Sequence, residues 1–86
     1  MRIDLFLKLI GVAKTRMAAK RLCDLEKVLV GAKPVKPSHE TAVGEILEIV
    51  LPKKKIQIKV QQIPAGKSVS RQDRPLYFEQ ISSEDW

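Results

Sequence analysis

The chain has 86 residues, of which 44% are hydrophobic and 30% charged, and a formal net charge of +6 at pH 7. It is long enough for one domain with a small core, and its composition is that of a globular protein, which excludes a disordered chain. Four aromatic residues are too few for a module that stacks successive bases on aromatic rings. A single cysteine, no secretion signal and no apolar run near the roughly 20 residues of a membrane span favour a cytoplasmic protein without membrane contact.

The positive charge is concentrated at the start of the chain. Residues 1–36 hold nine Lys and Arg against three acids, whereas the remaining fifty residues hold seven basic and seven acidic side chains. A folded segment that carries the whole surplus predicts a surface that binds a polyanion. Nucleic acid is the simplest such partner.

Two short helices are predicted at the N-terminus. Residues 3–10 have the apolar spacing of one helical face, and Gly11 is placed to end that helix. A second helix is predicted after Thr15, whose hydroxyl can accept a backbone N–H of the first turn. The apolar positions of the first helix are Ile3, Phe6, Leu7 and Ile10, and those of the second are Ala18, Ala19, Leu22 and Leu25.

Strand-type patterns follow from residue 28. Residues 28–30 are expected to form a hairpin with a strand that begins at Val35, and two prolines confine that strand to a sheet edge. The two-residue turn 31–32 is predicted as type II′, because glycine comes first. Residues 46–51 and 56–62 predict a second antiparallel hairpin.

The C-terminal segment is expected to dock on the domain. Lys67–Pro75 is a polar, basic loop, Leu76–Phe78 is an apolar anchor, and Ser82–Trp86 is predicted to be a frayed tail. The predicted fold class is therefore α+β, with two N-terminal helices packed on a small antiparallel or mixed sheet and a C-terminal docking segment.

The strongest candidate site is a group of cations around the start of the second helix. Lys14 and Arg16 flank the expected N-cap, where free N–H groups and the helix dipole favour phosphate. Lys20 lies one turn after Arg16, with Arg21 beside it. Together with Arg2, these side chains predict a surface that binds phosphate oxygens without reading base sequence directly. The alternative is a solvated cationic helix face.

Other chemistry-bearing residues have simpler interpretations. Asp4 is expected to stabilise the first helical turn or to pair with Arg2 or Arg16, and so to act on a ligand only indirectly. His39 is predicted to be a surface residue in a turn, and Cys23 a small packing residue. One histidine and one cysteine are too few for a zinc site or a Cys–His pair, so we expect no catalytic residue, metal or cofactor.

Two further basic segments leave alternatives open. Lys53–Lys55 form an expected hairpin tip that serves solubility or contacts RNA or anionic lipid. The Lys67–Arg74 loop either orders on RNA or is a solvated linker. Tyr77 and Phe78 are expected to pack against the domain rather than to stack on bases.

A series of motifs occurs in a fixed order along the first half of the chain. The motifs are Arg2-Ile3-Asp4-x-Phe6-Leu7, Lys14-Thr15-Arg16, Ala18-Ala19, Leu22, Lys27-Val28-x-Val30, Val35-Lys36-Pro37-Ser38 and Val43-Gly44-Glu45-Ile46-Leu47-Glu48-Ile49. This series resembles the RNA-binding domain named after small-subunit ribosomal protein S4. Within that family, the chain is similar to the stand-alone bacterial heat-shock protein 15 and its ribosome-quality-control relatives, over about residues 2–50.

The chain also departs from this family pattern. Glu26 stands where a glycine is usual, which predicts that the second helix ends without a left-handed residue. Gly31-Ala32 replaces the usual Asn-Gly of the hairpin, and Glu45 stands where aspartate is common. These changes affect turns and leave the basic residues in place.

The resemblance implies a non-enzymatic factor that binds structured RNA. The expected partners are ribosomal RNA and tRNA on a large ribosomal subunit blocked by nascent-chain tRNA, in recycling or quality control. Residues 1–63 would form the S4-type domain, and residues 64–86 the basic loop, anchor and tail. The implied RNA contacts are Arg2, Lys14, Arg16, Lys20 and Arg21, with Lys27, Lys33 and Lys36 at the rim.

Two alternatives stand beside this interpretation. One is an accessory protein for ribosome assembly or RNA modification. The other is a protein-interaction module that adds the edge strand at Val35-Lys36 to a partner sheet. The sequence gives no indication of oligomeric state.

Overall fold

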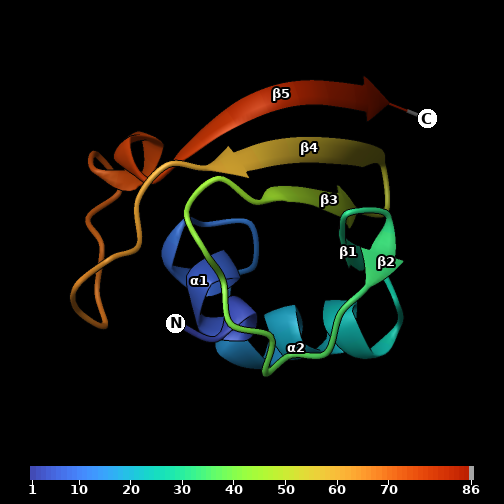
Figure 1. The fold of residues 1–86 in the computed structure, drawn as a ribbon, viewed down its shortest axis with the longest axis horizontal. Coiled ribbons are helices and arrows are strands. Elements are labelled where there is room, and N and C mark those ends of the chain that lie inside the picture. The colour runs from blue at the N-terminus through green and yellow to red at the C-terminus, as the bar shows by residue number, and fades with distance from the viewer. Residues whose placement is uncertain (86) are drawn as a thin grey trace.

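The computed structural model describes residues 1–85 and shows two helices lying on one side of a five-stranded sheet (Figure 1). Every strand pair is antiparallel, in the order β2-β1-β3-β4-β5. The α+β class is therefore confirmed, with an antiparallel rather than a mixed sheet. The elements are α1 (Ile3–Leu9), α2 (Arg16–Asp24), β1 (Val28–Val30), β2 (Lys33–Pro34), β3 (Ile46–Val50), β4 (Lys54–Val60), a 3₁₀ turn η1 (Arg74–Leu76) and β5 (Phe78–Asp85).

The core lies between α1 and the middle strands. The four apolar residues predicted for the first helical face are all buried, at most 4% exposed. They pack against alternate residues of β3 and β4, whose period-two pattern directs one face of each strand to the helices. The core residues from α1, β3 and β4 are Ile3, Phe6, Leu7, Ile10, Leu47, Ile49, Ile56, Ile58 and Val60.

The connection from α1 to α2 is fixed by hydrogen bonds that satisfy the helix ends. Gly11 has φ +85°, the Gly11 N–H donates to Lys8 O at 3.1 Å, and the Val12 N–H donates to Leu7 O at 3.0 Å. Glycine adopts this left-handed conformation at little steric cost. At the start of α2, Thr15 Oγ1 accepts the Ala18 N–H at 3.0 Å. Both helix boundaries predicted at Gly11 and Thr15 are confirmed.

The buried side of α2 differs from the predicted one at its end. Leu25 follows the helix as its C-cap and is 64% exposed, so its prediction as a core residue is wrong. Ala19 and Cys23, one turn apart, are the buried pair instead. Burial, with smaller effects from the negative charges of Asp4 and Asp24, raises the pKa of the Cys23 thiol to about 11. Cys23 is thus the packing residue that the sequence predicts.

The end of α2 also corrects a prediction. Glu26 has φ +60°, the Glu26 N–H donates to Cys23 O at 3.0 Å, and the Lys27 N–H donates to Leu22 O at 2.9 Å. This pair of bonds is a Schellman motif, which needs a left-handed residue at this position. The prediction that the helix ends without one is wrong, because the two hydrogen bonds hold a glutamate in a conformation that usually favours glycine.

The first hairpin uses a different turn from the predicted one. Gly31 and Ala32 both have positive φ, +59° and +67°, with Val30 opposite Lys33. Two successive left-handed residues are typical of type I′, whereas type II′ has only the first. Type I′ also matches the right-handed twist of the paired strands, and this offsets the strain at Ala32.

The edge strand that follows is shorter than expected. β2 consists of Lys33 and Pro34 alone, so Val35 lies after the strand rather than at its start. A two-residue edge with a proline offers few backbone groups to a partner strand. This disfavours the alternative of a module that pairs through Val35-Lys36.

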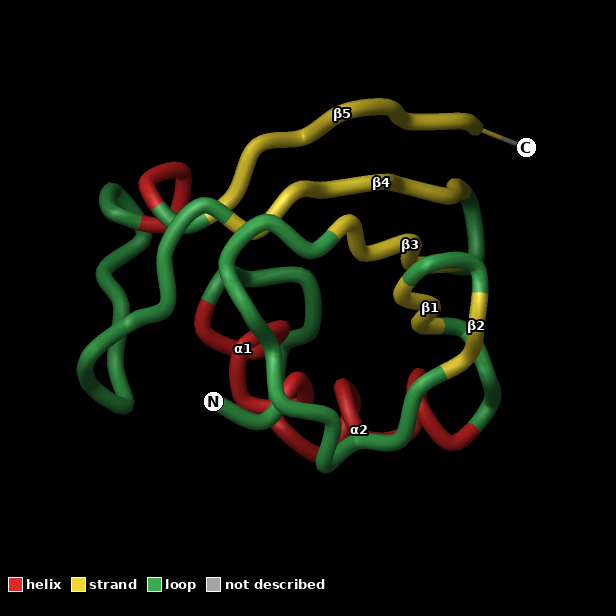
Figure 2. The backbone as a smooth tube through the Cα atoms, viewed as in Figure 1, coloured by secondary structure: helices red, strands yellow, loops and turns green. Residues whose placement is uncertain are grey.

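The C-terminal tail is part of the sheet. β5 pairs with β4 from Phe78 opposite Val60 to Asp85 opposite Lys54, with a bulge between Gln57 and Ile58. Figure 2 shows the two strands side by side, beyond the long loop that connects them. The prediction of a frayed tail is wrong for residues 82–85, and Trp86 lies outside the described residues. The apolar anchor is confirmed for Tyr77 and Phe78, which pack on the core, and is wrong for Leu76, which is 57% exposed.

Candidate nucleic-acid interface

The cations of α1 and α2 meet around one buried carboxylate. Asp4, in the first turn of α1, lies 3.1 Å from Arg2 Nη2 through its Oδ2 and 3.4 Å from Arg16 Nε through its Oδ1. The Asp4 side chain is 3% exposed, whereas those of Arg2 and Arg16 are 46% and 49% exposed. One acid therefore orients two guanidiniums whose outer faces remain open to solvent. The predicted pairing of Asp4 with an arginine is confirmed for both candidates.

A loop far along the chain holds Arg2 and Asp4 in place. The Ile3 and Asp4 N–H groups at the start of α1 donate to His39 O at 2.8 Å and to Pro37 O at 3.3 Å. The N-terminal ammonium donates to Glu40 Oε2 at 2.9 Å, and this contact lowers the pKa of the Glu40 carboxyl. These bonds satisfy helix N–H groups that have no partner within the helix.

The two arginines and Lys20 line a shallow hollow of about 290 Å³, which we call the α2 hollow and define by Arg2, Asp4, Arg16, Met17 and Lys20. Three cations face one carboxylate there, so the hollow carries net positive charge. Because Asp4 is almost completely buried, the accessible polar atoms belong to the cations. Guanidiniums present planar donor pairs that match phosphate oxygens, and such contacts position a protein on RNA by shape and backbone.

The structure brings together three of the eight predicted contact residues. Arg21 is exposed in the last turn of α2 and lies outside the α2 hollow. Lys14, also exposed, lines a different hollow. Lys27, Lys33 and Lys36 lie beyond the end of α2, on and beside β1 and β2. The α2 hollow itself therefore contains Arg2, Arg16 and Lys20, and the other five predicted contact residues lie outside it.

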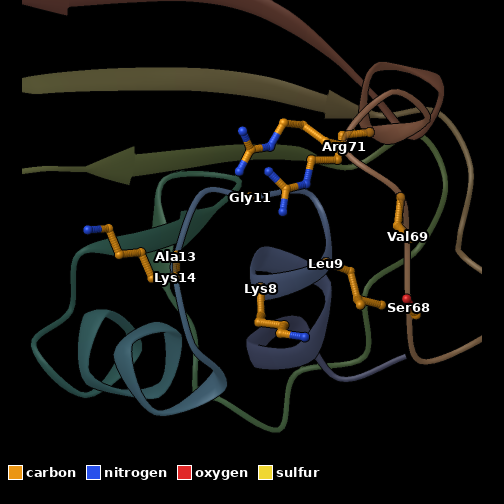
Figure 3. A pocket seen from close by; sticks show the side chains of 9 residues that line it. Lys8, Leu9, Gly11, Ala13, Lys14, Ser68, Val69 and Arg71 are labelled. Carbon is orange, nitrogen blue, oxygen red and sulfur yellow. The ribbon is translucent and has the colours of Figure 1, made fainter.

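Three cations outside the predicted contact set lie near Lys14, and two of them belong to the loop for which RNA binding was left open. Lys8 in α1, with Arg71 and Arg74 from the C-terminal loop, lines the same hollow as Lys14 (Figure 3). The basic composition of the loop was a signal for Arg71 and Arg74. The sequence around Lys8 gives no sign that it belongs to a basic site, because the cations near it come from the C-terminal part of the chain.

The remaining polar candidates have structural partners. His39 is 27% exposed and its Nε2 lies 3.0 Å from Glu45 Oε2, so it is less accessible than the predicted surface residue. Glu45 Oε1 also accepts the Ala42 N–H at 2.9 Å, which fixes the turn before β3. Lys55 pairs with Glu48 at 2.6 Å, leaving Lys53 and Lys54 at the hairpin tip.

Within residues 1–85, no group of three or more His, Cys, Asp or Glu side chains is arranged to hold a metal ion. Neither helix described there is long and apolar enough to cross a membrane.

Comparison with known proteins defines the class. The S4 domain family model matches residues 1–47, which include both helices, the α2 hollow and the hairpin of β1 and β2. The chain belongs to the S4 domain family.

Two relatives from Helicobacter pylori strains, both named RQC P-site tRNA stabilizing factor, are 35% identical over 78 residues. The match covers 91% of this chain and 93% of each relative. The hypothetical protein HP1423, known from a solution structure, has 33% identity and a TM-score of 0.82, and the match covers 95% of this chain and 98% of that one. The resemblance predicted from the motifs is confirmed.

The fold is shared with a more distant protein. Heat Shock Protein 15 of Vibrio cholerae, described as trimeric, superposes with a TM-score of 0.87 at 18% identity, over 95% of this chain and 82% of that one. This likeness supports the fold.

Proposed function

We propose that this protein is an RNA-binding factor of translation quality control, acting in the cytoplasm on a ribosomal large subunit that carries tRNA. Its relatives are named for stabilising a P-site tRNA. The single observation that carries the proposal is the α2 hollow, where Asp4 fixes Arg2 and Arg16 with their outer faces open. Such a surface binds and holds RNA, and the proposal contains no catalytic step.

The geometry favours recognition of phosphates and shape over base identity. The α2 hollow presents guanidinium and ammonium donors, and Met17 is its exposed apolar member, at 61%. Structured RNA displays phosphates and 2′-hydroxyls along its helices, which suit such donors. Binding should therefore be strong at low salt and tolerant of base changes that preserve RNA shape.

The test compares Arg16→Ala with Lys59→Ala, which removes one exposed cation from β4, outside the α2 hollow. Affinity for purified large subunits is measured across a range of salt concentrations. We expect Arg16→Ala to weaken binding and to reduce the log–log salt slope by about 0.7–0.9, the effect of one lost phosphate contact. The Lys59→Ala variant should keep the wild-type slope. Equal slopes for Arg16→Ala and wild type would contradict the assignment of Arg16.

A second measurement identifies the bound particle. Lysate is fractionated on a sucrose gradient, and the RNA cross-linked to the protein is mapped. Cross-links to tRNA and to the large subunit in one particle are expected. Cross-links confined to immature ribosomal precursors would support the assembly alternative instead, and co-purification with a protein that survives nuclease would support an interaction module.

A further inference from the structure

A second basic hollow lies at the C-terminal end of α1. It has a volume of about 360 Å³ and is bounded on one side by α1 and the residues that follow it, and on the other by the segment before η1 (Figure 3). We call it the loop hollow. Its lining includes Lys8, Gly11, Lys14, Ser68, Arg71 and Arg74.

The cations of the loop hollow have no acidic partners in the described chain. Within residues 1–85, none of Lys8, Lys14, Arg71 and Arg74 has a carboxylate oxygen within 4 Å. The α2 hollow differs, because Asp4 lies among its cations. Four like charges lining one hollow repel each other, and an anion placed between them relieves that repulsion.

Arg74 is seated directly on the backbone at the end of α1. A Cβ atom at Gly11 would lie 2.7 Å from Arg74 Nη1 and 3.0 Å from its Cζ, so the guanidinium occupies space that only a glycine leaves free. Arg74 Nε is buried and has no hydrogen-bond partner within residues 1–85. The guanidinium therefore packs against Gly11 with no described group to compensate its charge, an arrangement that is uncommon in native structures.

The helix dipole explains only part of this cluster. The C-terminal end of a helix attracts cations, which accounts for Lys8 in the last turn and for Arg74 beside Gly11. Lys14 and Arg71 are exposed and lie outside α1, so the dipole of that helix does not account for their positions. They leave the mouth of the hollow basic and open to solvent.

The loop that supplies the arginines is tied down at its base. The Gln61 N–H donates to Tyr77 O at 2.9 Å, which closes residues 62–76 into a loop. β5 then pairs with β4 directly after Tyr77. The pairing of β5 with β4 therefore anchors the loop that carries Arg71 and Arg74 beside the end of α1, where these arginines line the same hollow as Lys8.

We propose that the loop hollow binds phosphates of the RNA backbone, at nucleotides distinct from those bound by the α2 hollow. This inference rests on the proposed RNA-binding function. Arg2 and Asp4 belong to the start of α1, and Lys8 and Gly11 to its end. A helix of seven residues separates the two hollows by about 10 Å along its axis. Two guanidiniums and two ammoniums are donors suited to phosphate oxygens.

The first test is the salt dependence of binding to large subunits. The double variant Lys8→Gln/Arg71→Gln is compared with Lys59→Gln, which removes an exposed cation of the β3–β4 hairpin outside both hollows. Arg74 is left intact, because its partly buried side chain also packs on Gly11. We expect the first variant to reduce the log–log salt slope by about 1.4–1.8, the effect of two phosphate contacts, and the hairpin variant to keep it.

Arg16→Ala, measured in parallel, separates the two proposals. If the salt slope is reduced for Arg16→Ala but unchanged for Lys8→Gln/Arg71→Gln, RNA binding by the loop hollow is contradicted. RNA binding by the α2 hollow is then still supported. Unchanged slopes for both variants mean that RNA binding itself is wrong. Circular dichroism establishes that each variant is folded.

The second test locates the bound nucleotides. An iron chelate that cleaves nearby RNA is attached to Ser68→Cys at the loop hollow or to Met17→Cys at the α2 hollow. Cys23 is 4% exposed and its thiol pKa is raised to about 11, so it does not compete for labelling. We expect the two positions to cut different nucleotides. Cleavage from Met17→Cys alone, or identical cuts from both, would overturn the proposal.

A control distinguishes the RNA backbone from a free anion. Inorganic phosphate should compete with RNA no better than chloride at the same ionic strength. Selective competition that Lys8→Gln/Arg71→Gln abolishes would identify a site for free phosphate instead and overturn the assignment to RNA.

Discussion

Asp4 is the residue that converts two flexible arginines into a defined surface. Its carboxylate is buried between Arg2 and Arg16, and its backbone N–H is held by Pro37. Hydrogen bonds between a carboxylate and charged donors are stronger than bonds between neutral groups, and Asp4 is the buried member of both pairs. Its importance for binding would come through the orientation of the arginines, since the cations form the accessible surface.

Asp4→Asn tests this positioning role against a simple effect of charge. The change raises the net charge by one, so charge alone predicts tighter binding to RNA. We expect weaker binding and a smaller salt slope, because the arginines lose their shared anchor, together with a loss of about 1–3 kcal/mol in the free energy of unfolding. RNA affinity and chemical denaturation measure the two effects. Tighter binding by the variant would show that Asp4 merely neutralises the hollow.

At the scale of secondary-structure elements, the end of α2 contains a strained residue that substitution can relieve. Glu26 is held at φ +60° by the Schellman hydrogen bonds. We expect Glu26→Gly to increase the free energy of unfolding by about 1 kcal/mol, since glycine adopts this conformation without the steric cost. Lys20→Gly, in the middle of α2, should be destabilising by a similar amount. Denaturant titration of both variants tests the sign, and destabilisation by Glu26→Gly would contradict the argument.

β5 is the element that distinguishes the observed fold from the predicted one. If residues 82–85 were a frayed tail, their amide hydrogens would exchange with solvent as fast as those of the loop before η1. Pairing with β4 predicts slower exchange for the β5 amides that donate to β4. Hydrogen exchange followed by NMR or mass spectrometry measures this difference, and uniform fast exchange after Phe78 would exclude the strand.

The helix α1 could be predicted from the local sequence, whereas the strand β5 could not. Residues 3–10 have a helical period and a glycine at the end, so α1 was predictable from local signals alone. Residues 82–85 are polar and show no apolar alternation, because β5 lies on the edge of the sheet with its side chains exposed. Their strand conformation comes from the backbone groups of β4, which are distant in sequence.

The same distinction applies to the two hollows. Arg2, Asp4 and Arg16 are predictable as a group because two short helices and a capped turn bring them together. The loop hollow combines Lys8 with Arg71, and their meeting depends on how β5 pairs with β4. Left-handed Glu26 and Ala32 were also beyond local prediction, because hydrogen bonds around each position outweigh its own conformational preference.

For the whole molecule, two ion pairs that join separate segments predict how stability depends on pH. The N-terminal ammonium lowers the pKa of Glu40, and a hydrogen bond from Lys55 lowers the pKa of Glu48. Each carboxylate therefore contributes stability above its ordinary pKa of 4.5. That contribution is lost as pH falls through the lowered folded-state pKa, because the unfolded chain binds protons first.

We expect the thermal midpoint to fall on acidification below about pH 5, and to fall less steeply for Glu40→Gln and Glu48→Gln. The control Asp73→Asn changes an exposed acid that has no ion pair within residues 1–85, and it should keep the wild-type steepness. Calorimetry over this range tests the prediction. Identical pH profiles for wild type and both glutamine variants would refute it.

Two structural constraints act on position 11. It must adopt a backbone angle that few residues tolerate, and it must leave bare the spot on which the Arg74 side chain rests. Even a methyl group there would require the Arg74 guanidinium to shift. If the loop hollow binds RNA as proposed, Gly11→Ala would weaken that binding, although glycine has no side chain to offer the RNA. Position 11 is thus constrained by its own backbone and by a side chain from near the other end of the chain.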